Sequence, residues 1–167
     1  LQLLQSLGEA YLNLQHYELD EAQAILEYKI PYHHYKSCWS QSILAVIYHE
    51  KREYEEAIKI FAEIRKREPF RTQYMEIYST DLWHLQKETL LSVLAQELIQ
   101  HNKTSPVTWV VAGNCFSVLK EHDTAIKFFN RAIQMDPDFA YAHTLLGHEL
   151  LATEELEKAL GCYRKAI

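Results

Sequence analysis

Histidine and cysteine are the residues of this chain with the widest chemical repertoire, and the chain has nine histidines. Metal ligands on one helix stand three or four residues apart, so that they share a face. His33 and His34 are adjacent and should point apart on a helix, and His143 and His148 are five residues apart. No His-Glu-x-x-His or Cys-x-x-Cys motif is present. We therefore expect no metal and no cofactor.

The cysteines are Cys38, Cys115 and Cys162, an odd number at wide spacing. This pattern argues against a disulfide framework and fits a reducing compartment. Cys115 and Cys162 occupy positions typical of a helix interior, which favours buried, inert thiols over catalytic nucleophiles. The sequence has no glycine-rich phosphate loop and no serine elbow motif. It therefore predicts a protein that is not an enzyme.

The composition is that of a globular protein, with 48% hydrophobic and 24% charged residues in a chain of 167. The net charge of −6 argues against nucleic acid as a partner. No apolar run approaches the roughly 20 residues that cross a bilayer, so we expect no membrane partner. Only four glycines and four prolines occur, which favours long helices joined by short connections.

A pattern of small and aromatic residues recurs every 34 residues. The positions that recur are Gly113 and Gly147; Ala57, Ala125 and Ala159; and Phe61, Phe129 and Tyr163. This pattern resembles the tetratricopeptide repeat (TPR), in which each repeat is a pair of antiparallel helices, A and B. We predict an all-α, right-handed TPR solenoid of about five helix pairs. The predicted frames are 1–37, 38–71, 72–105, 106–139 and 140–167, the last one truncated, as expected for a fragment of a longer protein.

Each recurring residue type has a structural reason. The small residues, with Gly8 in the first frame, should mark close packing of helix A on helix B. The aromatic residues, with Tyr11 in the first frame, should fill the space between repeats. Pro69 and Pro137 should end helix B, because proline cannot continue a helix interior. Ser105 and Pro106 have the signature of an N-cap followed by proline at the first helical position.

A binding surface is expected on the A helices, which line the concave groove of such a solenoid. The predicted groove residues are Glu76, Thr80 and Trp83 in the third frame, Asn114 and Ser117 in the fourth, and Tyr141, Thr144 and His148 in the fifth. This mixture suits an extended peptide. The Asn114 amide both donates and accepts, so it can hold a peptide backbone or a terminal carboxylate.

Each of these assignments has an alternative. Asn114 can serve a local hydrogen bond, Trp83 can belong to the core between repeats, and Glu76 can be a solvated carboxylate instead of a partner for a ligand arginine. The groove positions lack the lysines and arginines with which some TPR co-chaperones hold the acidic tails of heat-shock chaperones. We therefore reject acidic tails as the ligand of this segment.

Several segments differ from the general TPR pattern: 75–80 (MEIYST), 82–87 (LWHLQK), 113–117 (GNCFS) and 140–149 (AYAHTLLGHE). Together they resemble the family of subunit three of the anaphase-promoting complex, or cyclosome, most densely from about Tyr74 onward. The resemblance implies a non-catalytic scaffold of a ubiquitin ligase that acts in cell division. It implies a groove that binds the C-terminal Ile-Arg tails of coactivators and of a core subunit, with Asn114 as a tail contact.

The same resemblance implies a homodimer formed through an N-terminal region that this chain lacks, and a protein of the nucleus and cytoplasm. Two other classes remain open from the sequence. The chain could be a TPR adaptor of another assembly, such as a chaperone or transport complex. It could also be a regulatory TPR segment attached to a catalytic domain.

Overall fold

The structure is a computed structural model that describes all residues, 1–167. It contains eleven α-helices and one π-helical segment, with no β-strand, which confirms the predicted all-α class. The chain divides into two compact units, unit 1 (Leu1–Asp81) and unit 2 (Leu82–Ile167), and the boundary falls inside one helix. Each unit is described by itself. No helix is both long and apolar enough to cross a membrane.

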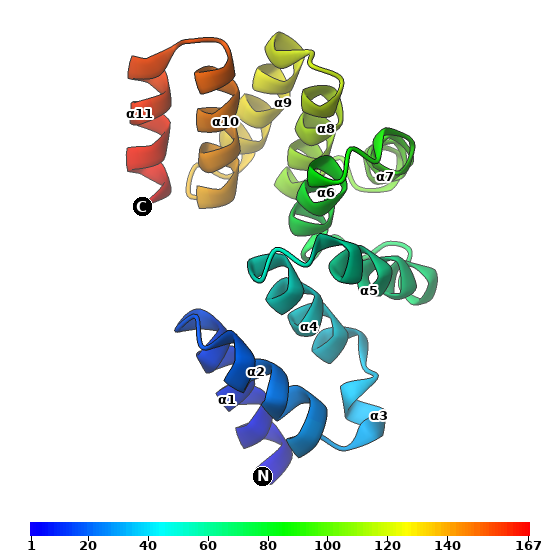
Figure 1. Ribbon diagram of the computed structural model, residues 1–167. Helices are drawn as coiled ribbons and strands as arrows, with labels where there is room; N and C mark the ends of the chain where they lie inside the picture. The colour runs from blue at the N-terminus through cyan, green and yellow to red at the C-terminus, as the bar shows by residue number, and fades with distance from the viewer. The chain divides into compact units, whose positions relative to one another are not determined.

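Unit 1 contains two layers of paired helices. Its elements are α1 (Gln2–Gln15), α2 (Leu19–Ala24), the π-helical segment η1 (Ile25–Lys29), α3 (Tyr32–Tyr35), α4 (Cys38–Glu50), α5 (Tyr54–Arg67) and the larger part of α6 (Met75–His84). In unit 1, α1 packs against α2 and η1, and α4 packs against α5 (Figure 1). The Ser37 side chain caps α4 by accepting the Ser40 N–H at 3.3 Å.

Unit 2 contains the more regular helix pairs. After the end of α6 it comprises α7 (Glu88–His101), α8 (Pro106–Val118), α9 (His122–Met135), α10 (Ala140–Ala152) and α11 (Leu156–Ala166). In this unit α8 pairs with α9 and α10 pairs with α11, while α9 also packs against α10 (Figure 1). Such pairs, stacked on their neighbours, are the arrangement that the 34-residue period predicted.

Helix ends follow the predicted signals at most positions. Pro106 occupies the first turn of α8, with Ser105 as the N-cap residue. Ser105 therefore occupies the N-cap position, but its side chain makes no capping hydrogen bond. α5 and α9 each end two residues before a proline, Pro69 and Pro137, as predicted.

The turns between paired helices share one backbone device that sequence analysis did not identify. Four residues spaced 34 apart adopt positive φ angles: Arg52 (62°), Gln86 (53°), Lys120 (63°) and Glu154 (65°). At one of these turns the Lys120 N–H donates to the Ser117 carbonyl at 2.9 Å, and the Glu121 N–H donates to the Phe116 carbonyl at 3.0 Å. This pattern ends each helix sharply. The sequence does not indicate these turns, because glycine, their usual marker, is absent from all four positions.

In unit 2 the small recurring residues are locked against the aromatic ones. A Cβ atom added to Gly113 would lie 2.4 Å from the Phe129 ring, and one added to Gly147 would lie 2.6 Å from the Tyr163 ring. Ala125 is fully buried, as are the equivalent alanines of the other repeats. The predicted close packing of helix A on helix B is confirmed there.

The first helix pair of unit 1 departs from this packing. Nothing lies within 4 Å of a Cβ atom added to Gly8, and Tyr11 is 44% exposed. Both predictions for these residues were wrong. α2 contains no aromatic residue, and Tyr28 of η1 is 84% exposed, so no ring reaches the Gly8 position.

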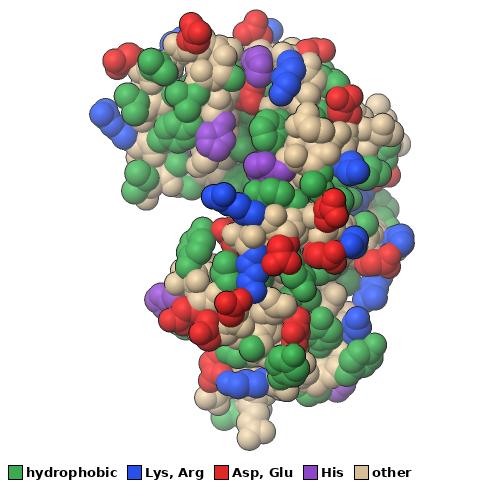
Figure 2. Space-filling model, in the orientation of Figure 1, with side chains coloured by type: hydrophobic (Ala, Val, Ile, Leu, Met, Phe, Trp, Pro, Cys, Tyr) green, Lys and Arg blue, Asp and Glu red, His purple; other side chains and the backbone are tan.

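The surface carries charges of both signs. On the face that Figure 2 shows, Lys and Arg side chains lie among Asp and Glu side chains. Several oppositely charged side chains form pairs along one helix, such as Lys59 with Glu56 at 2.6 Å. Exposed pairs of this kind contribute little to stability, typically less than about 1 kcal/mol.

Candidate peptide-binding site

The predicted groove residues are divided between the two units. Glu76 and Thr80 belong to unit 1, and the other six belong to unit 2: Trp83, Asn114, Ser117, Tyr141, Thr144 and His148. All eight lie on α6, α8 or α10, which are the A helices of their repeats. The assignment of these residues to a ligand stays a prediction, and their surroundings in the fold differ from one residue to the next.

Glu76 in the first turn of α6 has a carboxylate that is only partly compensated, by a backbone hydrogen bond that lowers its pKa less than burial raises it. Its Oε2 atom is shielded from solvent and has no hydrogen-bond partner. Burial raises the pKa of Glu76 from 4.5 to about 7 because the charged form loses its hydration. A cation that reached this oxygen would find an acceptor that the chain itself leaves unused.

The hydroxyl groups near Glu76 serve their own helix. Ser79 Oγ and Thr80 Oγ1 both donate to the Glu76 carbonyl, at 2.7 and 3.1 Å. Side chains of this type commonly bond back to the preceding turn. Thr80 is 8% exposed, so its side chain is buried in the fold and offers little surface to a ligand.

Trp83 and Ser117 belong to a buried polar network in unit 2. Trp83 Nε1 donates to Ser117 Oγ at 2.9 Å, and Ser117 Oγ in turn donates to Glu149 Oε1. His122 Nδ1 lies 2.6 Å from Glu149 Oε2. Both oxygens of the buried Glu149 are therefore partnered. The network joins α6, α8, α9 and α10 by their side chains, and the indole of Trp83 is engaged within the solenoid.

Sequence analysis missed Glu149 and His122 as members of this network. One signal pointed to it, since Trp83 and Ser117 stand 34 residues apart and occupy equivalent positions of consecutive repeats. A similar pair occurs in unit 1, where His49 Nδ1 lies 2.5 Å from Asp81 Oδ1. His49 is the residue 34 before Trp83, so polar contacts between successive A helices recur at this repeat position.

Asn114 lies in the middle of α8 and is 3% exposed. It takes part in an interaction within the chain. A local role for its amide and a contact with a ligand both stay predictions.

The remaining groove residues lie on α10. Thr144 Oγ1 donates to the Ala140 carbonyl at 3.2 Å, within the same helix. The His148 ring lies 5.7 Å from the Tyr163 ring, and burial lowers the pKa of His148. A lowered pKa keeps the imidazole neutral near pH 7, because an unperturbed histidine titrates near 6.5. His148 therefore supplies no fixed positive charge for an acidic ligand.

The histidines and cysteines show no shared ligand geometry. No group of three or more His, Cys, Asp or Glu side chains is placed to hold a metal ion. The His33 and His34 rings lie with centroids 4.0 Å apart, so the prediction that they point apart was wrong. They belong to α3, a single turn of four residues, where the two rings lean against each other. Cys115 is buried, as predicted, and Cys162 is partly buried.

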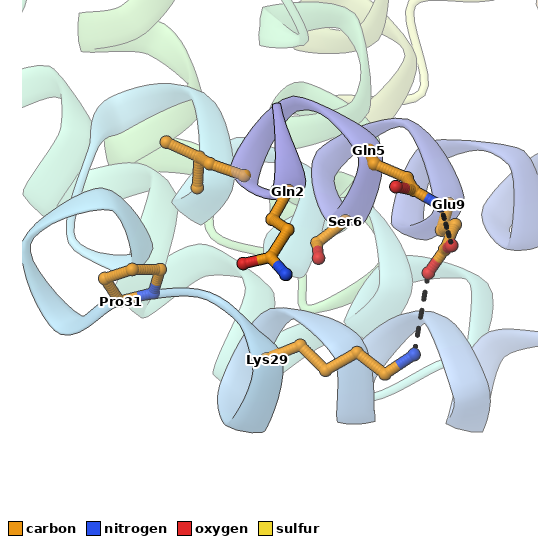
Figure 3. A pocket seen from close by; sticks show the side chains of 7 residues that line it. Gln2, Gln5, Ser6, Glu9, Lys29 and Pro31 are labelled. Atoms are coloured by element: carbon orange, nitrogen blue, oxygen red, sulfur yellow. Dashed lines mark hydrogen bonds and ion pairs between the residues drawn. The ribbon is translucent and has the colours of Figure 1, made fainter.

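A polar hollow of about 550 Å³ lies beside α1 and η1 (Figure 3). Figure 3 shows Lys29 reaching toward Glu9, at 3.5 Å, while Gln5 also contacts Glu9 at 3.5 Å. The charges of this hollow are thus paired with each other. None of the predicted groove residues lines it.

Two repeats match the family description "Tetratricopeptide repeat", at residues 42–71 and 107–139. Curated relatives cover much more of the chain. It is 53% identical over 138 residues to the human cell division cycle protein 27 homolog, and 41% identical over 167 residues to the anaphase-promoting complex subunit 3 of Schizosaccharomyces pombe. The chain belongs to the family of these proteins. The matches cover 83% and 100% of this chain but only 17% and 25% of the two relatives, so it spans about a fifth of the family's length.

Solved structures support the fold of this family segment. A crystal structure of the hetero-tetramer Cut9-Hcn1 of the anaphase-promoting complex matches with a TM-score of 0.75, at 18% identity, over 88% of this chain and 28% of that one. MamA from Desulfovibrio magneticus matches with a TM-score of 0.65, at 14% identity, over 99% of this chain and 93% of that one. These likenesses establish a TPR solenoid, as predicted.

Proposed function

We propose that this chain is a TPR segment of a non-catalytic scaffold subunit of the anaphase-promoting complex, a ubiquitin ligase that acts in cell division. In this proposal the protein docks neighbouring subunits and binds coactivators that end in Ile-Arg. The support is the membership of the family, whose Schizosaccharomyces pombe member is named for that complex. The segment also has a groove-forming fold, which suits binding more than catalysis.

Glu76 is the observation that carries the tail-binding part of the proposal. Its Oε2 atom has no partner in the chain, and burial holds its pKa near 7. A guanidinium group offers a planar set of donors that matches a carboxylate. Its arrival would favour the charged form of Glu76 and compensate the burial, so an arginine is the ligand group that this position accepts best.

Asn114 is separately proposed as a contact for the terminal carboxylate of such a tail. An amide N–H₂ group is a donor that a terminal carboxylate can accept. Because Asn114 is buried and already engaged in the chain, its contribution depends on a shared or exchanged hydrogen bond. Its loss is expected to weaken binding less than the loss of Glu76.

The proposal is tested by titrating the chain with a short peptide that ends in Ile-Arg and carries a free carboxylate. Three matched peptides replace arginine with citrulline, block the terminal carboxylate as an amide, or replace isoleucine with glycine. Calorimetry at pH 7.5 should show binding to the parent peptide that is reduced about tenfold by citrulline, since hydrogen bonds to a charged group contribute roughly 1.5 to 3 kcal/mol. Glu76→Gln should produce the same loss, and Asn114→Ala a smaller one.

Glu55→Gln is the matched control, because it removes one negative charge from an exposed position in the first turn of α5. It should leave binding unchanged. Equal binding of the arginine and citrulline peptides, or of the free and amidated tails, would overturn the tail-binding proposal. The chain would then be a TPR adaptor for another ligand.

The place of the protein in the complex is tested on the full-length parent. We propose that it forms homodimers through a region outside these residues and resides in the nucleus and cytoplasm. Purification of a tagged parent from its own cells should recover the other subunits of the ligase, and imaging of the same tag should show both compartments. Recovery of none of those subunits would refute the scaffold role.

A further inference from the structure

A separate hollow of about 260 Å³ lies within unit 1, over its A helices. Three elements contribute its walls: α1, α4 and the start of α6. Its lining residues are Tyr11, Leu14, Gln15, Tyr17, Val46, Glu50, Tyr74 and Ile77. Val46 is at a predicted groove position of the second frame, but none of the eight groove residues named above lines this hollow.

Glu50 is the charged group of the hollow. Tyr17 Oη donates a hydrogen bond to Glu50 Oε2 at 2.8 Å. That hydrogen bond, together with the negative charge of Glu50, raises the pKa of Tyr17, so the phenol stays protonated and remains a donor.

No cation of the chain forms an ion pair with Glu50. Arg71 acts on Tyr74 of the hollow electrostatically, but its guanidinium is bound to Glu68 at 2.7 Å and to the Gln73 side chain at 2.8 Å. Two carboxyl groups of α6 have the same sign as Glu50: Glu50 helps to raise the pKa of Asp81, and Glu76 helps to raise the pKa of Tyr74. The hollow is thus negative and lacks a counter-ion.

The remaining walls suit a flat organic cation with an aliphatic stem. Leu14 and Val46 form an apolar floor, at 8% and 7% exposed. Tyr11 and Tyr74 bring two aromatic rings to the same hollow. Tyr11 is 44% exposed, so its ring is accessible to a ligand. Aromatic faces attract cations, and guanidinium groups also stack on them. This accounts for an exposed tyrosine at a position where the repeat pattern predicted core.

We propose that this hollow is a binding site for an arginine side chain inside a partner segment, with Glu50 as its counter-ion. The stem would lie on Leu14 and Val46, the plane would stack on the tyrosines, and Glu50 Oε1 would accept the guanidinium. The site needs no chain terminus. This distinguishes it from the Ile-Arg tail site proposed for Glu76 and Asn114, although Glu76 acts electrostatically on Tyr74 of the hollow.

The test uses the 167-residue chain with blocked pentapeptides, N-acetyl-Gly-Gly-Xaa-Gly-Gly-amide, in which Xaa is arginine, lysine, citrulline or glutamine. Amide and aromatic NMR shifts report where each peptide binds. The arginine peptide should shift the residues that line the hollow with an affinity of about 1 mM, typical of a few contacts. Lysine should bind about threefold more weakly because it lacks the planar group, and citrulline and glutamine should cause no shifts there.

Two variants locate the effect. Glu50→Gln should weaken the arginine peptide about tenfold, and Tyr17→Phe should weaken it about threefold, since the carboxylate loses the donor that orients it. Glu55→Gln, with the same change in net charge, should leave this binding unchanged. Circular dichroism melts verify that the variants fold.

Shifts that are equal for arginine and citrulline, or that persist in Glu50→Gln, would refute the proposal. Shifts that map outside the residues lining the hollow would refute it as well. Because every peptide in the series is amidated, a failure of the tail proposal leaves these outcomes unchanged. The two sites can therefore fail or succeed separately.

Discussion

The first helix pair of unit 1 and the two helix pairs α8/α9 and α10/α11 of unit 2 derive from the same repeat, yet their packing differs. In unit 2, Gly113 and Gly147 each receive an aromatic ring from the paired helix. In unit 1, Gly8 has nothing within 4 Å of the position of a Cβ atom. The second helix of this pair is α2, which runs on into the π-helical η1 and is followed by the short α3.

This difference shows what the glycine of the repeat is for. It matters where a ring occupies the space that a side chain would need, and it has no packing role where the ring is absent. The exposure of Tyr11 on α1 is a second sign that this helix pair has lost the packing of the repeat. A residue that is released from core packing becomes available to a surface hollow, which is the role proposed for Tyr11 beside Glu50.

The sharpest way to break the comparison is to place the same side chain at both glycines. Gly113→Val forces a methyl group into the ring of buried Phe129, whose nearest atom is 2.4 Å from the Cβ position. We expect the free energy of unfolding to fall by about 3 kcal/mol, the upper range for overpacking. Gly8→Val should change it by less than about 0.5 kcal/mol, because valine and glycine have similar helix propensities.

Urea denaturation followed by circular dichroism measures both values. Gly147→Val provides a second test of the tight class, against the partly exposed Tyr163 ring. Similar costs for Gly8→Val and Gly113→Val would mean that the two helix pairs are packed alike, and the comparison would collapse.

The repeat pattern predicted unit 2 well and the start of unit 1 poorly, for a physical reason. A 34-residue spacing reports contacts that every repeat makes, such as Ala125 against its paired helix. It cannot report contacts that one repeat has lost, since Gly8 and Tyr11 keep the residue types of the pattern without its partners. The positive φ at Arg52 escaped as well, because local hydrogen bonds enforce it on a residue that does not favour it.

The candidate site was predictable in position but less so in chemistry. Helix periodicity placed Trp83 and Ser117 on A helices, where the structure has them. Their hydrogen bonds to each other and to Glu149 depend on the distance between helices, which no sequence pattern specifies. Whether Glu76 Oε2 finds a hydrogen-bond partner likewise depends on the side chains that the fold brings near it, and the structure brings none.

Two shielded carboxylates, one in each unit, differ in their hydrogen-bond partners. Glu149 is hydrogen-bonded through both oxygens, whereas Glu76 Oε2 has no partner. At pH 8, Glu149→Gln should lower the free energy of unfolding by about 2 kcal/mol, since it removes charge-assisted hydrogen bonds. Glu76→Gln should raise it by about 1 kcal/mol, because a buried charge without a partner is unfavourable.

The pH dependence of Glu76 gives this contrast a second readout. Its pKa is 4.5 when unperturbed and about 7 in the folded chain, so between these values the folded state holds a proton that the unfolded state has lost. Its contribution to stability is therefore complete below pH 4.5 and is lost as the pH rises to 7. Urea midpoints from pH 4.5 to 8 should fall less steeply in Glu76→Gln than in the parent. Parallel curves would show that Glu76 is well hydrated.

The smallest expected effect concerns a feature that the two units share. Arg52 in unit 1 and Glu154 in unit 2 both have φ angles above 60° at the ends of their helices. A side chain in this region costs roughly 1 to 2 kcal/mol, which glycine avoids, although glycine also loses more backbone entropy on folding. The net gain from Arg52→Gly or Glu154→Gly should be about 0.5 kcal/mol.

Arg52→Ala is the control, since it removes the charge and the long side chain but keeps the Cβ atom, and it should give no gain. Thermal melts resolve these differences if each variant is compared with the parent in parallel. A gain at Glu154 without one at Arg52 would show that the turn of unit 1 is less strictly held than that of unit 2. That result would extend the difference between the units from their side-chain packing to their backbone. Equal gains would restrict the difference to the side chains and leave the helix-ending turn as the element that all repeats preserve, even where the glycine and aromatic contact has been lost.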